Sequence, residues 1–94
     1  MTSPFAYLDQ LSQKLVLIGI DHETTFPTEG PKPSRLIDAQ SAKSLGRISV
    51  WLSDEWDFEV LDIDSEQSVF AAHLDHPTDE QLSDTFEEWL ENMK

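Results

Sequence analysis

Two histidines and a carboxylate lie close together in the segment His73-Leu74-Asp75-His76. Imidazole nitrogens and a carboxylate oxygen are common zinc ligands, and one further ligand from elsewhere in the chain would complete such a site. The segment ends a predicted strand, and side chains alternate in direction along a strand. A spacing of three therefore turns the two rings to different sides. We interpret both residues as ordinary loop histidines and expect no metal centre.

Oxygen ligands are also frequent between Asp62 and Glu66, where a calcium loop is conceivable. An EF-hand loop needs a glycine at its sharp turn and a bidentate glutamate at its end. This segment has no glycine and is too short, so we interpret it as a polar hairpin turn. Carboxylate pairs for acid–base catalysis are abundant, but neither a glycine-rich phosphate loop nor a nucleophile elbow is present. A chain of 94 residues has little volume for an enclosed pocket. We expect neither an enzyme nor a cofactor.

A large aromatic residue lies among acids in the segment Asp54-Glu55-Trp56-Asp57, with Glu59 two residues further on. An aromatic anchor inside a charged rim is a typical composition of a protein interface. The alternative interpretation is that Trp56 belongs to the core.

The other two tryptophans differ in context. Trp51 falls on the face of its predicted strand opposite Ile48, Val50 and Leu52, so it is either exposed or packed under a loop. Trp89 falls on the apolar stripe of a predicted helix, which places it in the core.

The periodicity of apolar residues and the positions of glycine and proline predict the elements that would position these residues. We predict a helix over 4–18, an extended segment over 20–26, a loop over 27–33, a short strand over 34–39, strands over 47–52, 56–60 and 67–74, and a helix after Pro77. Residues 41–45 are either a loop or a helical turn, and Gly46 ends that segment. Thr78 and Gln81 form a capping box for the last helix. The predicted fold is α+β, one domain over residues 1–94, with an antiparallel meander of three to four strands and both terminal helices packed against it.

The formal net charge of −13 is concentrated in one half of the chain. Residues 54–93 hold fourteen of the nineteen acidic residues and neither lysine nor arginine. Such a surface repels nucleic acid and anionic lipid, and it attracts a basic protein. We therefore predict a partner-binding surface made of Trp51, Asp54, Glu55, Trp56, Asp57, Glu59, Asp84, Glu87, Glu88 and Glu91. The absence of cysteine, of a signal peptide and of a membrane-spanning run favours the cytoplasm.

Three kinds of binding protein fit this charge. The first is an inhibitor that covers the cleft of a basic enzyme. The second is a mimic of nucleic acid, whose carboxylates would lie in regular rows. The third is a regulatory or scaffold module for another basic protein.

Three segments resemble the TriTu type of bacterial immunity protein: residues 31–34, residues 45–51 and residues 57–62. The resemblance implies a protein without catalytic activity that neutralises the toxin domain of an Rhs effector, delivered by a type VI secretion system. It also implies that the toxin is an ADP-ribosyltransferase that uses NAD to modify elongation factor Tu. An NAD-binding cleft attracts phosphate and is expected to be basic. We therefore expect a 1:1 complex that occludes the cleft and buries ~800 Å² on each partner.

Overall fold

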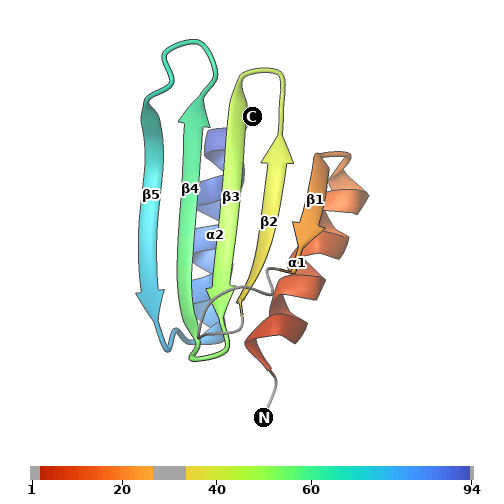
Figure 1. The fold of residues 1–94 in the computed structure, drawn as a ribbon, viewed down its shortest axis with the longest axis vertical. Helices are drawn as coiled ribbons and strands as arrows, with labels where there is room; N and C mark the ends of the chain where they lie inside the picture. Colours follow the sequence, from red (N-terminus) through yellow and green to blue (C-terminus); the bar gives the residue numbers. More distant parts are fainter. Residues whose placement is uncertain (1–2, 27–33, 94) are drawn as a thin grey trace.

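The computed structural model describes residues 3–26 and 34–93, and both helices cover the same face of an antiparallel sheet (Figure 1). In chain order the elements are α1 (Pro4–Ile18), β1 (Asp21–Thr25), β2 (Ser34–Gln40), β3 (Ser44–Trp51), β4 (Glu55–Asp62), β5 (Ser68–Asp75) and α2 (Asp79–Met93). The predicted α+β class is confirmed. The loop predicted over 27–33 lies outside the described residues.

The sheet has five strands in the order β1-β2-β3-β4-β5, and each strand pairs antiparallel with the next. The predicted number of three to four is therefore too low, although the meander is confirmed. β1 explains the difference. Its sequence, Asp21-His22-Glu23-Thr24-Thr25, has no strongly apolar residue, so hydrophobic alternation cannot identify it.

Residues 41–45 contain the turn of the β2–β3 hairpin rather than a helical turn. The Ser41 N–H donates to the Ser44 carbonyl at 2.9 Å, and the Ser41 hydroxyl accepts the Ser44 N–H at 3.1 Å. β3 begins at Ser44, so the prediction that Gly46 ends an element is wrong. Glycine is required there because α2 packs directly on it. A Cβ atom at Gly46 would lie 2.5 Å from Met93 Sδ and 2.6 Å from Trp89 Cζ2.

Both helices begin at a capping residue. The Ser3 hydroxyl accepts the Phe5 N–H ahead of α1, which ends at Gly19 with a φ of +78°. For α2, the Thr78 N–H donates to the Gln81 side chain at 2.8 Å, and the Gln81 N–H donates to the Thr78 hydroxyl at 3.1 Å. This reciprocal pair is the predicted capping box.

One hydrophobic core fills the space between the sheet and the two helices. The predicted stripe of α2 is confirmed, since all five of its members are buried: Leu82, Phe86, Trp89, Leu90 and Met93. In α1, Leu8, Leu11 and Leu15 are buried. Ile18, the last residue of the helix, is 53% exposed. Within the described residues, neither helix is long and apolar enough to cross a membrane.

Candidate partner-binding surface

The face of the sheet opposite the helices, here called the open face, carries part of the predicted site. Glu55, Asp57 and Glu59 alternate along β4 with the buried Trp56, Phe58 and Val60. Because successive side chains of a strand point to opposite faces, the three acids all project from the open face. We call them the open-face cluster. Glu59 is exposed, and Glu55 and Asp57 are half-buried.

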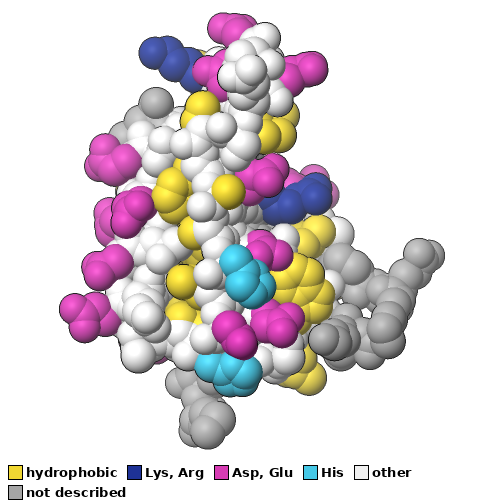
Figure 2. Space-filling model, turned by 90° about the vertical axis from the view of Figure 1, so that its left-hand side faces the viewer, with side chains coloured by type: hydrophobic (Ala, Val, Ile, Leu, Met, Phe, Trp, Pro, Cys, Tyr) yellow, Lys and Arg dark blue, Asp and Glu magenta, His cyan; other side chains and the backbone are white. Residues whose placement is uncertain are grey.

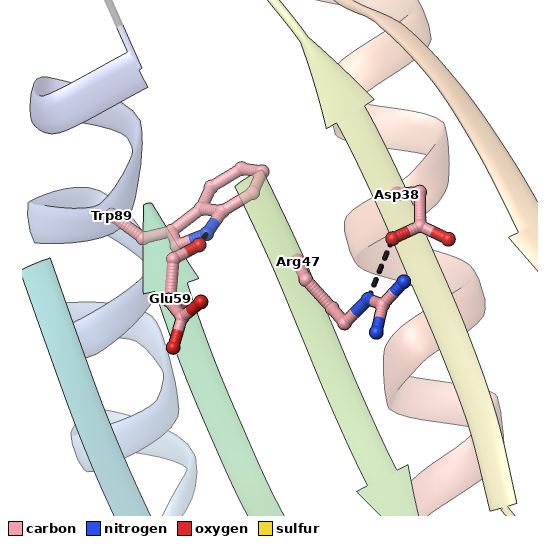
Figure 3. Close-up of polar contacts among 4 residues, drawn as sticks. All are labelled: Asp38, Arg47, Glu59 and Trp89. Atoms are coloured by element: carbon pink, nitrogen blue, oxygen red, sulfur yellow. Dashed lines mark hydrogen bonds and ion pairs between the residues drawn. The ribbon is translucent and has the colours of Figure 1, made fainter. Parts of the chain in front are cut away.

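Arginine 47 is the basic neighbour of this cluster, and it pairs with Glu59 across β3 and β4. Its Nε nevertheless donates to Asp38 Oδ1 at 2.7 Å. Figure 3 shows the guanidinium directed toward Asp38 on β2 and away from the Glu59 side chain. The Glu59 carbonyl oxygen accepts the Trp89 indole N–H at 3.0 Å, which ties β4 to α2. The Glu59 carboxylate therefore remains directed to solvent on the open face.

Histidine 73 lies on β5 opposite Asp57, and its Nδ1 is 2.5 Å from Asp57 Oδ1. The hydrogen bond to Asp57 raises the pKa of the His73 imidazole above its ordinary value of 6.5. Desolvation opposes the shift, and the charges of Asp57, Glu55 and Asp75 add to it. The side chains of Asp57 and His73 line a shallow open hollow, together with Arg47, Ser49 and Glu59. The hollow suits contact with a protein surface better than enclosure of a small molecule.

Tryptophan 56 is completely buried, so the interpretation as an exposed interface anchor is wrong and the core interpretation is confirmed. Its ring stacks on Phe58 with 6.1 Å between centroids, and Tyr7 of α1 meets it edge-on. The indole N–H donates to Asp54 Oδ1 at 2.9 Å. Asp54 adopts a φ of +68° in the turn before β4. This predicted contact residue therefore has a local structural role.

Trp51 and Leu52 supply the exposed apolar surface near this turn instead. Trp51 is half-buried at the end of β3 on the open face. Leu52 was predicted to lie on the same strand face as Ile48 and Val50, which are buried, but it is 53% exposed. The reason is that β3 ends at Trp51, so the alternation stops one residue earlier than predicted.

The remaining predicted residues lie on the opposite side of the molecule. Asp84, Glu87, Glu88 and Glu91 are exposed on α2, and its buried stripe faces the sheet. We call these four residues the α2 cluster. The sheet and the helix layer separate them from the open-face cluster, and strand β5 lies at the edge between the two. Figure 2, which views this edge, shows acidic side chains along both sides of it.

The two histidines of segment 73–76 and the acids of segment 62–66 make contacts with residues near them. His73 contacts Asp57, whereas His76 contacts Asp75 at 2.5 Å. In the turn after β4, Asp62 Oδ1 accepts the N–H groups of Asp64 and Ser65 at 2.9 and 3.0 Å. Within residues 3–26 and 34–93, no three histidine or acidic side chains come close enough to hold a metal ion.

The fold is a small sheet covered on one side by helices, with acids on two outer surfaces, and this charge distribution suits a basic protein partner. The chain belongs to the TriTu family, because the family model described as "Immunity protein TriTu" matches residues 7–92. The match includes all five strands and most of both helices. Membership in an immunity family assigns the chain a toxin-neutralising role and favours inhibition by binding. A comparison with curated proteins found no match.

Proposed function

We propose that this protein binds a cognate antibacterial toxin domain and neutralises it by covering its active-site cleft with an acidic surface. The observation that carries the proposal is the segregation of charge. Fourteen acids and no lysine or arginine lie between Asp54 and Met93, and this half folds into two acidic surfaces that meet at one edge of the sheet. A surface of this kind attracts a basic cleft and repels other acidic proteins.

The proposed toxin is an ADP-ribosyltransferase that uses NAD to modify elongation factor Tu, delivered by an Rhs effector of a type VI secretion system. This proposal rests on the family of the chain. A cleft that binds the pyrophosphate of NAD needs positive charge, which complements the acids of the immunity protein. The proposed complex is a 1:1 heterodimer that forms in the cytoplasm, where elongation factor Tu is modified.

The proposed contact residues are Trp51, Glu55, Asp57 and Glu59 on the open face, together with Asp54 at its border. The α2 cluster is the second proposed contact. Trp56 is not included, since a fully buried side chain offers no surface to a partner.

Neutralising variants of equal charge test which surface binds. One variant carries Glu55→Gln, Asp57→Asn and Glu59→Gln, and the second variant carries Asp84→Asn, Glu87→Gln and Glu88→Gln. Each removes three negative charges with little change of shape. Co-expression with the toxin domain measures protection, and stopped-flow mixing measures the association rate. If neither variant weakens protection or slows association, the acidic surfaces do not recognise the toxin.

An enzymatic assay separates sequestration from repair. The toxin, NAD and elongation factor Tu are mixed with increasing amounts of the immunity protein. We expect ADP-ribosylation to stop at one equivalent of immunity protein per toxin. Elongation factor that was modified beforehand should keep its ADP-ribose in the presence of the immunity protein. Loss of the ADP-ribose would show that the protein reverses the modification.

A further inference from the structure

Strand β5 is the last strand in the sheet order, and within residues 3–26 and 34–93 it pairs only with β4. It is eight residues long and contains no proline, lysine or arginine. Proteins commonly protect such an edge with prolines, lysines, short strands or a covering segment. From Phe70 to Asp75 the ladder with β4 is regular, and the register shift at Val60/Leu61 leaves Val69 without a ladder partner near the start of β5. Among the residues that the structure describes, the edge is thus regular from Phe70 to Asp75 and without these protections.

One hydrogen bond fixes which backbone groups of β5 point outward. The His76 N–H donates to the Asp54 carbonyl at 2.9 Å. In an antiparallel ladder the hydrogen-bonded positions recur at every second residue. Counting back from His76, the residues that point toward β4 are Leu74, Ala72 and Phe70. The N–H and C=O groups that point away from the sheet belong to Ala71, His73 and Asp75.

The side chains of β5 are incompletely covered. Phe70, Ala72 and Leu74 face the core but are only half-buried, and Val69 is 49% exposed. Figure 2 looks directly at this edge and shows a strip of hydrophobic side chains beside the strand. An additional strand would bury this strip and would pair with the outward backbone groups.

The charges around the edge indicate what kind of strand fits. The open-face cluster lies on one side of β5 and the α2 cluster on the other. A second copy of this chain would bring the same acids against them, and the like charges would repel. A strand flanked by lysine or arginine would instead place its basic side chains beside both clusters. The edge therefore favours a basic protein over self-association.

We propose that the partner docks by adding an extended strand to β5, with basic residues on both sides of that strand. The proposal rests on the proposed function in taking the partner to be the toxin domain. It also explains how one partner can contact the open-face cluster and the α2 cluster together. A flat surface would meet only one of them, whereas a strand on the β5 edge lies between both.

Amide hydrogen exchange followed by NMR tests the proposal on the unmodified protein. The probe is the toxin domain whose growth inhibition this protein suppresses in co-expression. In the free protein we expect the amides of Ala71 and His73 to exchange rapidly, because they point away from the sheet. In the complex we expect their exchange to slow by about a hundredfold or more, because they become ladder hydrogen bonds. Bound toxin without this protection would overturn strand addition while leaving the toxin-neutralising function intact.

A proline variant tests the same point by affinity. Ala71→Pro removes one outward N–H, and proline is tolerated on edge strands. Thr24→Pro on β1 is the matched control, since β1 is the other edge of the sheet. We expect Ala71→Pro to weaken toxin binding by roughly tenfold and Thr24→Pro to leave it unchanged.

The other outcomes of these two experiments also support or overturn strand addition. Equal affinity of wild type and a folded Ala71→Pro variant would overturn the proposal. If Ala71→Pro does not fold, the exchange measurement on the wild-type complex decides alone. Protection of the same amides in a concentration-dependent dimer without toxin would assign the edge to a second copy and would also overturn it. Failure of the protein to suppress any toxin would instead refute the proposed function.

Discussion

Replacing Gly46 by alanine is expected to destabilise the protein because the new methyl group has no room. The Cβ would lie 2.5 Å from Met93 Sδ and 2.6 Å from Trp89 Cζ2. Favourable contacts between such atoms lie at about 3.5–4.0 Å, so α2 must move away from β3 by about 1 Å. A gap of that size also forfeits a quarter to a half of the dispersion energy of each affected contact.

The magnitude follows from these distances. Overpacking of a dense core costs roughly 1–3 kcal/mol. Displacing α2 also strains the hydrogen bond from the Trp89 indole to the Glu59 carbonyl, which is 3.0 Å long. Such a bond contributes about 1 kcal/mol, so we expect a total loss of roughly 2–4 kcal/mol. At about 4–8 °C per kcal/mol for a domain of this size, the melting temperature should fall by at least ~8 °C.

Urea denaturation followed by tryptophan fluorescence measures the loss, and Gly19→Ala is the control. No atom lies within 4 Å of a Cβ at Gly19, but its φ of +78° is unfavourable for alanine. That substitution should cost only about 1 kcal/mol, from the backbone alone. Adding Met93→Ala to Gly46→Ala should cost less than the sum of the single changes, because one clashing atom is gone. A Gly46→Ala variant no less stable than Gly19→Ala would refute the close seating of α2 on β3.

Three further changes test local contacts. Asp54→Ala should lower the free energy of unfolding by about 1–3 kcal/mol, because it leaves the buried Trp56 indole N–H unpaired. The control Asp54→Asn removes the same charge but keeps an acceptor for this N–H. Equal stability of the two variants would contradict the role of Asp54 as the acceptor. Asp57→Asn should lower the pKa of His73 toward its ordinary value in an NMR titration. Because that pKa is raised in the folded protein, the pair stabilises the fold fully below about pH 6.5, and the contribution disappears as the pH rises through the raised value. The stability of Asp57→Asn should therefore depend less on pH in this range. Glu66→Gly should raise the melting temperature, since Glu66 has a φ of +59° and glycine relieves about 1 kcal/mol of strain; a lower melting temperature would refute this.

Local signals explain which parts of the fold were predictable. The capping box at Thr78 and Gln81 and the apolar spacing of α2 are both encoded within a few residues, and both are confirmed. The alternation of β4 likewise placed Asp57 and Glu59 on one face. β1 was uncertain because an edge strand of polar residues gives no apolar alternation.

Tertiary contacts decide the rest of the candidate site. Alternation puts Trp56 and Phe58 on one face but does not say which face the helices cover. Only the packing of α1 and α2 shows that this face is the core. Gly46 was misread for the same reason, since a glycine inside a strand and a glycine at a turn differ only in what packs against them. The separation of the open-face cluster from the α2 cluster was not accessible either, because it depends on which side of the sheet α2 covers.

That separation makes the kinetics of toxin binding informative about the interface. Charges steer association over about a Debye length, ~8 Å at physiological ionic strength, so both clusters should raise the association rate. Dissociation depends mainly on the charges that are in direct contact. If only the open face binds, neutralising the α2 cluster slows association and leaves dissociation unchanged. If the partner straddles β5, neutralising either cluster also speeds dissociation. The two off-rates therefore distinguish a one-sided contact from an interface centred on the edge of the sheet.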